Sequence, residues 1–490
     1  MSNFASLFNR MSDVTSTENG GKAFRTTGSD LLNLFANIGG MRRRDTEDII
    51  DMWLAARNED KELADNLILY ARNIRDAGLG ERRIGRILLK KLAEIDPNKI
   101  KRNLATIVDT GRWDDLFIFE GTPVEGHVWK FIEAQFRQDV EDMRDNKPIS
   151  LLAKWMPSIN TSSADTKRLA KKICVVFSLT PRTYRKTLSA LRRYIDIVER
   201  KMSAGQWDEI NFEGVPAVAM SRYVNTFNKR VPEKFKAYKD ALVKGEAKVN
   251  AAALYPYDIA QKFFKNCHWN YTSCKLDPID EEQWKALPNY VNEDYDVVVV
   301  ADVSGSMTIN NCQPMATSVG LATYFAQHNK GAYHGMYMTF TNDPHFIKIG
   351  DDWSLEKTLR FVCQEGVGYS TNLDRAFEAI YNTAKVANEA PKALVVISDM
   401  EINKWYSGDY CDSIASKWAK KYAEIGLEAP KLILWNVESR GGRVLAQQSE
   451  NVGFCSGYGV GPFKNLTSLI EKSAYESMVE ILSQPVFQWI

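Results

Sequence analysis

Residues 295–307, YDVVVVADVSGSM, decide how the second half of this 490-residue chain folds. The four valines are β-branched and apolar, a pattern typical of a strand that is buried on both faces in a parallel sheet. Asp302, Ser304 and Ser306 follow at once, so alternate polar side chains can converge above the end of that strand. A carboxylate with two hydroxyls is a hard-oxygen ligand set that suits Mg²⁺ or Mn²⁺. The stretch therefore predicts a buried strand with a metal site at its carboxyl end.

Three further apolar runs follow the first one: MYMTFT (336–341), KALVVISD (392–399) and PKLILWNV (430–437). Alternation of strands and helices of this kind predicts a doubly wound parallel α/β sheet. Ligands of such sheets bind at the carboxyl ends of the strands, near a topological switch point. The helices that separate the strands are expected at residues 315–327, 355–364, 373–387 and 411–425.

Two more oxygen ligands are expected at the same edge of the sheet. Thr371 in GYSTNLD precedes a helix, and Asp399 ends the strand in VVISDMEI. A metal with few charged ligands stays electrophilic and can accept an outside carboxylate or phosphate. A second interpretation is that these polar groups only cap helix N-termini and bind no metal.

The first half of the chain has a helical pattern. Apolar residues recur at three and four positions in TEDIIDMWLAARN (46–58) and DKELADNLILYARNI (60–74), as in amphipathic helices. Pairs of helices joined by short turns predict an α-solenoid or a bundle, and we expect a HEAT-like helical region. The expected organisation is a flexible segment at 1–27, the helical domain at 28–275, a linker at 276–293 and the α/β domain at 294–490.

The charge is divided unevenly, although the net charge is only +1. Residues 1–290 carry 47 Lys and Arg against 39 Asp and Glu, and residues 291–490 carry 16 against 23. A basic first half indicates that a polyanion binds there, and solvated faces of a helical protein are the other interpretation. The composition, 44% hydrophobic and 26% charged, excludes a disordered or collagen-like chain.

The most informative basic segment is TPRTYRKTLSALRRYIDIVERKMSAG (180–205), which is expected to form one helix. One stripe of it is apolar, whereas a row of four cations, Arg182, Lys186, Arg193 and Arg200, lies nearly opposite, within about 40° of one another at about 100° per residue. A row of cations fits the phosphates along a nucleic-acid backbone, and a solubilising surface is the alternative. The residues expected to bind RNA are Arg182, Arg185, Lys186, Arg192, Arg193 and Arg200.

The cysteines, the apolar runs and the first residues of the chain argue against several other kinds of protein. None of the seven cysteines forms a CxxC pair, so Cys267 and Cys274, with His268 beside them, are interpreted as ordinary thiols rather than zinc ligands. No apolar run approaches the roughly 18 residues that span a bilayer, and the first residues do not form a secretory signal. We therefore expect a soluble cytoplasmic protein with no membrane partner.

Residues 295–460 resemble a von Willebrand factor A (vWA) domain with a metal-ion-dependent adhesion site. The motifs that carry the resemblance are DVSGS at the end of the first strand, STN at 370–372 and ISD at 397–399. The resemblance implies a resident Mg²⁺ or Mn²⁺ bound directly by Ser304, Ser306 and Thr371. It also implies that Asp302 and Asp399 hold the ion mainly through water. An acidic side chain of a protein partner would complete such a site.

Further motifs are spread over most of residues 28–470: ARNIRDAGLGERR (71–83), GRWDDLF (111–117), LLAKWMPS (151–158), the region 184–223, KVNAAALYPYDI (248–259), LILWNVESRGG (432–442) and VGFCSGYG (452–459). These motifs resemble domain-of-unknown-function family 2828, whose members carry a helical region followed by a vWA-like domain. More distantly, the layout is similar to the Ro autoantigen (TROVE) family, in which a ring of HEAT-like helices is closed by a vWA domain and binds small structured or misfolded RNAs.

Three functions follow from these patterns. The first is a non-catalytic RNA-binding scaffold, and the second is a metal-dependent protein-interaction module that binds no nucleic acid. The third is a metal-dependent hydrolase or nucleotidyl transferase that uses Glu401, but hydroxyl ligands do not form the paired acidic cluster of two-metal chemistry. The apolar end SQPVFQWI (483–490) is either packed as a final strand or a partner-binding peptide, and packing is favoured.

Overall fold

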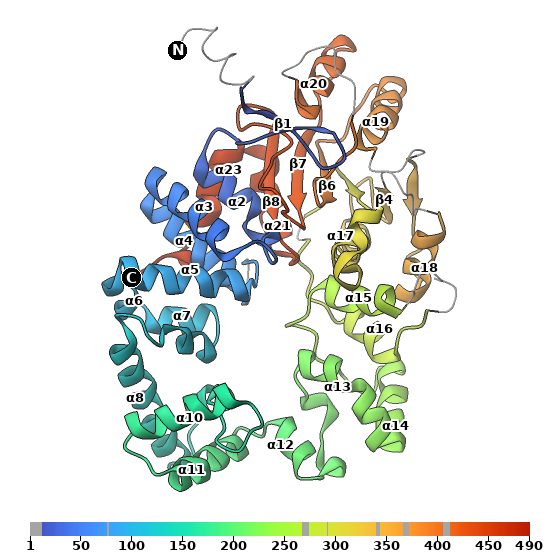
Figure 1. Ribbon diagram of the computed structural model, residues 1–490. Helices are drawn as coiled ribbons and strands as arrows, with labels where there is room; N and C mark the ends of the chain where they lie inside the picture. Colours follow the sequence, from blue (N-terminus) through green and yellow to red (C-terminus); the bar gives the residue numbers. More distant parts are fainter. Residues whose placement is uncertain are drawn as a thin grey trace. The chain divides into compact units, whose positions relative to one another are not determined.

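The structure is a computed structural model that describes residues 12–75, 78–266, 274–291, 293–339, 344–365, 372–404 and 412–490 (Figure 1). The chain forms two compact units. The sheet unit comprises residues 1–85, 216–221 and 249–488, and the helical unit comprises residues 86–215, 222–248 and 489–490. Among the described residues, no helix combines the length and the apolar composition that a membrane crossing requires.

The sheet unit is built on a six-stranded sheet with the strand order β5-β4-β3-β6-β7-β8. Five strands are parallel, and β5 pairs antiparallel with β4 at one edge. All residues of β3 and β6 are buried, as the unbroken apolar runs predict. The strands are β3 (Val297–Ala301), β4 (Met336–Thr339), β5 (Phe346–Lys348), β6 (Ala393–Ser398), β7 (Lys431–Asn436) and β8 (Val452–Ser456).

The doubly wound α/β fold is thus confirmed, and four strands lie where the sequence predicts them. The chain steps from β3 to β4 on one side and later returns to β6 on the other side of β3. The switch point is therefore between β3 and β6, whose carboxyl ends lead into Asp302 and Asp399. Two strands were missed, because β5 has only three residues and β8 contains a glycine and a serine.

Helices pack on this sheet. The long helix α17 contacts β3, β4 and β6, whereas α2, α22 and α23 contact β8 and its neighbourhood. The expected helices of the second half are confirmed where they are described. Helices of the sheet unit are α2 (Asp30–Asn37), α3 (Thr46–Glu59), α4 (Lys61–Arg72), α15 (Pro256–Asn266), α16 (Pro278–Lys285), α17 (Ile309–His328), α18 (Leu355–Glu365), α19 (Leu373–Ala387), α20 (Ile414–Glu424), α21 (Gly461–Lys464), α22 (Leu466–Glu471) and α23 (Ala474–Leu482), with short 3-10 turns at Ile38–Gly40, Gly305–Thr308 and Pro485–Phe487.

The N-terminal residues do not follow the expected domain boundaries. Residues 12–27 were expected to be flexible, but β1 (Val14–Ser16) and β2 (Lys22–Phe24) form an antiparallel hairpin. Phe24 is fully buried, and its backbone exchanges two hydrogen bonds with Val444 at 2.7 and 3.0 Å. The helices α2 to α4 likewise belong to the sheet unit and not to a separate helical domain, because their apolar faces pack on one another and on β8.

One contact shows how closely the N-terminal helices meet the sheet. The amide of Gly39 donates to the hydroxyl of Ser456 at 2.9 Å. A Cβ atom on Gly39 would lie only 2.5 Å from backbone atoms of Gly457. Only glycine allows this approach between the turn after α2 and the end of β8.

The expected linker at 276–293 is also more ordered than its composition suggests. Asp277 caps α16, and Pro278 occupies the first helical position. An amide at that position has no partner within the helix, so the missing N–H of proline costs no helical hydrogen bond. Ile279 is fully buried, and the indole of Trp284 donates to Gln327 at 2.8 Å. The described part of this segment therefore contains a packed helix of the sheet unit, Pro278–Lys285.

The helical unit has an aromatic core. Phe136 lies 5.5 Å from Phe177 and 6.2 Å from Tyr184 between ring centroids, and Phe212 packs on Phe227 and Phe235. Helix α5 (Arg82–Ile95) begins in the sheet unit and ends in the helical unit, and α13 (Ala217–Arg230) likewise has its first residues in the sheet unit and its remainder in the helical unit. The other elements are α6 (Pro97–Arg102), α7 (Leu104–Thr110), α8 (Glu125–Arg144), α9 (Leu152–Trp155), α10 (Ala164–Val176), α11 (Pro181–Tyr194), α12 (Val198–Ser203), α14 (Pro232–Val243) and 3-10 turns at Trp113–Phe119, Trp207–Glu209 and Phe212–Gly214.

The single basic helix predicted at 180–205 is wrong beyond Tyr194. Helix α11 ends there, and Asp196 adopts a left-handed conformation with φ of 47° before α12 begins at Val198. Asparagine and aspartate tolerate that conformation better than other non-glycine residues, so Asp196 can end the helix. Arg200 therefore has no helical phase in common with Arg182.

The C-terminal residues and Cys274 differ in part from what the sequence predicts. The C-terminal residues are packed, as expected, although as a 3-10 turn instead of a strand, with the ring of the buried Phe487 5.3 Å from that of Tyr70. Cys274 is disulfide-bonded, so its interpretation as an ordinary thiol is wrong. Cys267 lies outside the described residues.

Candidate metal centre and basic surface

Asp302 is the buried anchor of the candidate metal centre, which we define as Asp302, Ser304, Ser306 and Asp399. Its Oδ1 accepts a hydrogen bond from the Ser304 amide at 2.9 Å, and its Oδ2 accepts one from the Ser398 hydroxyl at 2.5 Å. Each carboxylate oxygen retains acceptor capacity beyond these bonds. Burial, and then the neighbouring Asp399, raises the pKa of Asp302 to about 7.

The two serine hydroxyls meet beside this aspartate. The Oγ atoms of Ser304 and Ser306 are 3.0 Å apart. Two ligands at right angles around Mg²⁺, each about 2.1 Å from the ion, lie about 3.0 Å apart. The hydroxyl pair therefore fits two adjacent positions of an octahedral Mg²⁺ or Mn²⁺ site.

Asp399 follows β6 and is nearly fully buried. Its Oδ1 accepts from the Glu401 amide at 3.1 Å, and its Oδ2 accepts from the Arg440 guanidinium at 3.0 Å. Burial raises the pKa of Asp399, although Arg440 opposes that shift. The same Nη2 atom of Arg440 also donates to the carbonyl of Ser306 at 3.2 Å. A protein cation thus bridges the two strand ends of the candidate metal centre.

The N-terminal hairpin supplies the next layer of contacts. Arg440 donates through Nη1 to the Glu18 carboxylate at 2.7 Å. The Glu18 amide in turn donates to Glu401 at 2.6 Å, and Thr17 donates to the carbonyl of Ile402 at 2.7 Å. The hairpin turn is therefore held on the loop after β6 by both backbone and side chains.

The predicted ligand Thr371 lies outside the described residues, so its part in the site stays a prediction. Within the described residues, no group of three or more His, Cys, Asp or Glu is arranged to hold a metal. A metal here would consequently depend on hydroxyl ligands, as the sequence pattern predicts.

Sequence reasoning missed Arg440, Ser398 and Glu18. A signal existed for Arg440, because ESRGG follows the predicted strand at 430–437 and so had to reach the same sheet edge. No such signal marked Glu18, which lies in a segment expected to be flexible and reaches the site only through tertiary packing.

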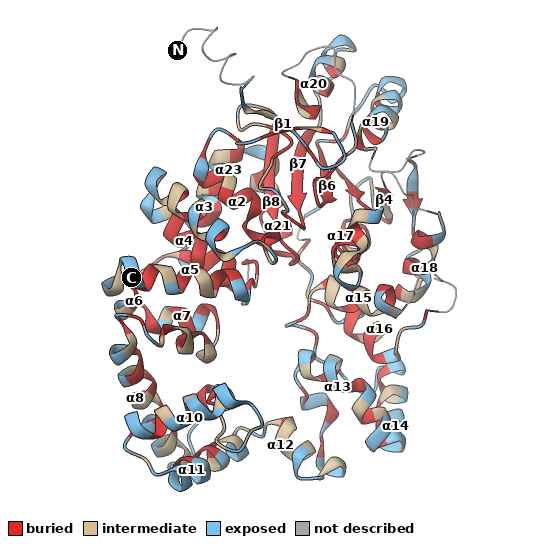
Figure 2. Cartoon of the chain, in the orientation of Figure 1, coloured by how far each residue is buried: buried red, intermediate tan, exposed pale blue. Residues whose placement is uncertain are grey.

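The second candidate site is the exposed face of α11. Its opposite face is buried through Tyr184, Leu188 and Leu191, which pack the helix on α8 and α9. Figure 2 shows the outer face of α11 as exposed. Its exposed cations have no hydrogen-bond or ion-pair partner among the described residues: Arg182, Arg185, Lys186 and Arg193.

Arg192 does not belong to that face. Its guanidinium donates to the carbonyls of Ala153 at 2.8 Å and Met156 at 2.6 Å, and to Ser158 at 2.8 Å. Burial lowers the pKa of Arg192 because the charged form is desolvated. This arginine therefore stabilises the end of α9, and we remove it from the proposed RNA surface.

Arg200 is half-buried on α12, beyond the break after α11. Its Nε atom is buried with no hydrogen-bond partner among the described residues. Because it lies on another helix, the row of four cations predicted from helical periodicity does not form. We also remove Arg200 from the proposed surface.

Helix α10 adds cations of two kinds. Arg168 and Lys172 both bind Glu120, at 2.6 and 2.9 Å, which lowers the pKa of that carboxyl to about 2. Lys167 and Lys171 are exposed and have no such partner among the described residues. The basic surface is defined here as Arg182, Arg185, Lys186 and Arg193 of α11 with Lys167 and Lys171 of α10.

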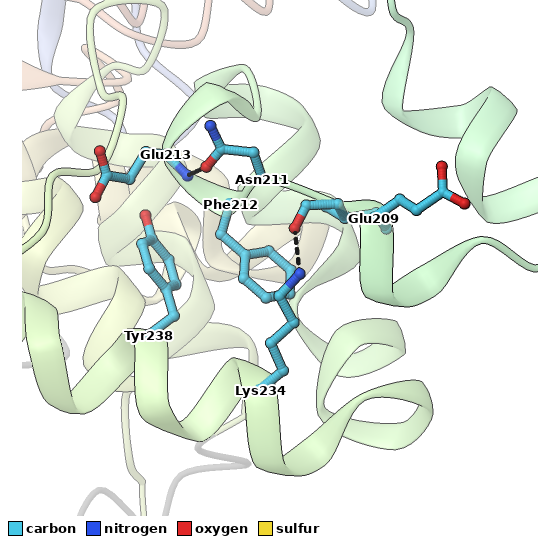
Figure 3. A pocket seen from close by; sticks show the side chains of 7 residues that line it. Glu209, Asn211, Phe212, Glu213, Lys234 and Tyr238 are labelled. Atoms are coloured by element: carbon cyan, nitrogen blue, oxygen red, sulfur yellow. Dashed lines mark hydrogen bonds between the residues drawn. The ribbon is translucent and has the colours of Figure 1, made fainter.

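A cavity of about 370 Å³ lies elsewhere in the helical unit (Figure 3). Lys234 on its wall donates to the carbonyls of Asp208 and Ile210 at 2.6 and 2.8 Å. Tyr238 donates to the carbonyl of Lys248 at 2.8 Å, and burial raises its pKa to about 12. Lys234 and Tyr238 are thus already engaged by backbone carbonyls of the helical unit.

Comparisons with known proteins divide the chain at the same place as the change in sequence pattern. Residues 127–294 match the family model described as Domain of unknown function (DUF2828). Residues 296–480 match a second model, Domain of unknown function (DUF7788). The expected resemblance to the first family is confirmed for residues 127–294, whereas the α/β half matches a separate model.

Two individual proteins are similar along most of the chain. The Uncharacterized protein L728 of Acanthamoeba polyphaga mimivirus is 28% identical over an alignment of 528 residues, which covers 97% of this chain and 89% of that protein. The crystal structure of the Deinococcus radiodurans RO (RSR) protein has a TM-score of 0.38 and 14% identity, over 89% of this chain and 92% of that chain. This chain thus joins a region similar to DUF2828 to a region similar to DUF7788 in one polypeptide.

Proposed function

We propose that this protein is a non-catalytic RNA-binding scaffold that holds RNA by its phosphates on the basic surface of α10 and α11. The observation that carries the proposal is a set of exposed cations on one helix that have no side-chain partner in the described part of the chain, Arg182, Arg185, Lys186 and Arg193. Arginine and lysine side chains in such an array neutralise successive phosphates and release counterions.

The surrounding charge supports this proposal. The helical unit carries 31 Lys and Arg against 21 Asp and Glu, a net charge of +10. The rest of the chain is acidic, since the whole protein has a net charge of only +1. A positive unit attracts a polyanion over a longer range than single side chains do. Contacts of this kind select for phosphates and carry no base specificity.

The test is a titration of fluorescent structured and single-stranded RNA at about 50 and 200 mM salt, a range over which phosphate contacts lose much affinity. The variant R182E/R185E/K186E/R193E should bind at least about thirtyfold more weakly and lower the slope against log salt by about 3 to 4.

The matched control is K330E/K348E/K385E/K392E, which makes the same charge change at exposed lysines of the sheet unit. It should retain most of the affinity. Equal losses in the two variants would mean that only net charge matters, and no binding by the wild type at low salt would refute the proposal.

A metal-dependent interaction module is the second candidate function, favoured by the 3.0 Å distance between the hydroxyls of Ser304 and Ser306. Those two hydroxyls, with Thr371 as a predicted third ligand, would hold the ion, and Asp302 and Asp399 would support it. A bound Mg²⁺ would supply an open coordination position for an acidic side chain of a partner protein.

Manganese binding followed by electron paramagnetic resonance tests this second candidate. The wild type should bind one Mn²⁺ that Mg²⁺ displaces, and S304A/S306A should bind none. The variant S189A/S483A removes two exposed hydroxyls elsewhere and serves as the control. Binding that survives in S304A/S306A would place the ion elsewhere.

The structure gives less support to a hydrolase or nucleotidyl transferase. Glu401, the carboxylate considered for that chemistry, is 5% exposed and accepts the Glu18 amide at 2.6 Å. Arg443 lies 3.6 Å from the same oxygen. A general base needs an acceptor that faces its substrate, whereas this carboxylate holds the hairpin.

A further inference from the structure

Arg440 is the feature of the candidate metal centre that the proposed functions do not use. Its Nη2 lies 3.0 Å from Asp399 Oδ2 and 3.2 Å from the carbonyl oxygen of Ser306. The Arg440 guanidinium therefore already places a positive charge between Asp399 and Ser306, two residues of the candidate metal centre. A divalent ion would bring its charge to the same neighbourhood.

The position of Arg440 is set from outside the site. Glu18 at the turn of the N-terminal hairpin accepts from Nη1 of Arg440 at 2.7 Å. The guanidinium is planar and presents its donors in a fixed fork, so one end binds Glu18 while the other binds Asp399. Glu18 is itself held by its amide on Glu401.

The rest of the hairpin is tied down independently of these side chains. Gly21 donates to the carbonyl of Ile402 at 3.2 Å, and Phe24 and Val444 exchange backbone hydrogen bonds. Glu18 therefore stays close to Arg440 whether or not Asp399 is engaged. The hairpin acts as a fixed support that keeps the guanidinium over the site.

We propose that Arg440 is a resident cation of the candidate metal centre, held on Asp399 by Glu18, and that a divalent ion binds only in competition with it. The consequence is that the N-terminal hairpin sets the metal affinity of the sheet unit. This inference uses the metal site of the second candidate function and does not depend on RNA binding.

Competition and simple charge repulsion can be separated with a neighbouring arginine. Arg443 lies on the same loop and is also cationic, but its ion pair is with Glu401 at 3.6 Å and not with Asp399. R440Q and R443Q thus make the same charge change at two positions. Only R440Q removes a donor from Asp399.

The probe is Mn²⁺ alone, titrated into the full-length, chelator-treated protein and followed by electron paramagnetic resonance of the free ion. R440Q should raise the Mn²⁺ affinity by at least about tenfold, because it removes a positive charge in direct contact with the site. R443Q should raise it by no more than about threefold, since Arg443 pairs with Glu401 instead of Asp399 and its side chain is partly exposed to screening solvent.

The sign of the effect of E18Q tests the role of the hairpin. Loss of a nearby carboxylate by itself lowers the affinity for a cation. If Glu18 acts by holding Arg440 on Asp399, E18Q instead raises the affinity, in the same direction as R440Q. A fall or no change in E18Q would overturn the role given to the hairpin.

Three further outcomes decide the main claim. Equal affinities of R440Q and R443Q would overturn the competition, as would the absence of Mn²⁺ binding in every variant including R440Q. Binding by R440Q when the wild type binds none would support it strongly. Thermal unfolding of each variant with chelator shows whether the sheet unit remains folded, and RNA binding should be the same in all of them.

Discussion

The two candidate sites of this protein use charge in opposite ways. In the candidate metal centre of the sheet unit, Asp302 and Asp399 are buried and each of their oxygens accepts a hydrogen bond. On the basic surface of the helical unit, Arg182 and Lys186 are exposed and have no partner among the described residues. Buried charges must be held by neighbours, because isolated ones are costly to desolvate. Exposed cations remain available to a ligand.

This contrast predicts that a substitution strongly changes the free energy of unfolding where neighbouring atoms surround the residue, and hardly changes it where the residue faces solvent. The strongest test compares two glycines. A Cβ atom on Gly39 would lie 2.5 Å from the backbone of Gly457, whereas one on Gly126 of α8 would have no atom within 4 Å. G39A should lower the free energy of unfolding of the sheet unit by about 3 kcal/mol or more.

G126A serves as the control and should raise stability by a few tenths to about 1 kcal/mol, since alanine is the better helix former. Urea denaturation followed by circular dichroism and tryptophan fluorescence measures both. A mild effect of G39A would mean that the contact between α2 and β8 can open without cost.

A second comparison concerns two neighbouring arginines of α11. Arg192 donates to the carbonyls of Ala153 and Met156, whereas Arg193 is exposed without a partner among the described residues. R192A should lower the free energy of unfolding of the helical unit by about 2 to 3 kcal/mol, because it leaves part-buried acceptors without donors.

R193A should change that free energy by less than about 0.5 kcal/mol. Each variant removes one positive charge. RNA affinity measured at low temperature, where both variants remain folded, reports whether the arginine contacts RNA, whereas the free energy of unfolding reports its contribution to stability. Equal destabilisation by both would contradict the division between a structural and a free arginine.

The next effect concerns pH and the candidate metal centre. Burial raises the pKa of Asp302 to about 7, above its value in the unfolded chain. The folded state therefore binds the proton more tightly, and the stability from this group is lost as the pH rises through about 7. In a metal chelator, lowering the pH from about 8 to 6 should stabilise the sheet unit by on the order of 1 kcal/mol.

D302N carries no titratable proton at this position and should abolish that part of the pH dependence. The measurement is thermal unfolding of the wild type and of D302N at the two pH values. A wild-type slope that D302N leaves intact would assign the titration to another buried carboxyl, such as Asp399, whose pKa burial also raises.

The smallest effect is expected from a single cation of the basic surface. R193E should weaken RNA binding severalfold and lower the salt slope by about 1, since one phosphate contact is lost. K385E, at an exposed lysine of the sheet unit, is the control and should leave the slope unchanged. A larger effect of K385E would move the RNA site to the sheet unit.

The sequence could predict most of the sheet because its signals are local. The sequence placed β3 by its four valines and β6 by one of the three further apolar runs. The polar residues that follow these two runs placed Asp302 and Asp399. The short edge strand β5 and the glycine-containing β8 gave weaker local signals. Their pairing is fixed by neighbouring strands, and context of this kind outweighs propensity.

The helical half shows the limit of periodicity. The residues of α11 that face the core were predicted correctly, since burial of an amphipathic stripe follows from spacing alone. The break at Asp196 was not, and with it the predicted position of Arg200 was lost. Arg192 was assigned to RNA because nothing in its local sequence shows that α9 ends beside it.

The sequence by itself determined a doubly wound α/β region with hydroxyl and carboxylate groups at its switch point, and a basic helical region before it. Tertiary structure alone decided that residues 12–85 belong to the sheet unit and that Glu18 and Arg440 meet Asp399. The physical reason is range. Apolar periodicity and strand ends are set by adjacent residues, whereas the partner of a buried charge is chosen by whichever segments the folded core brings together.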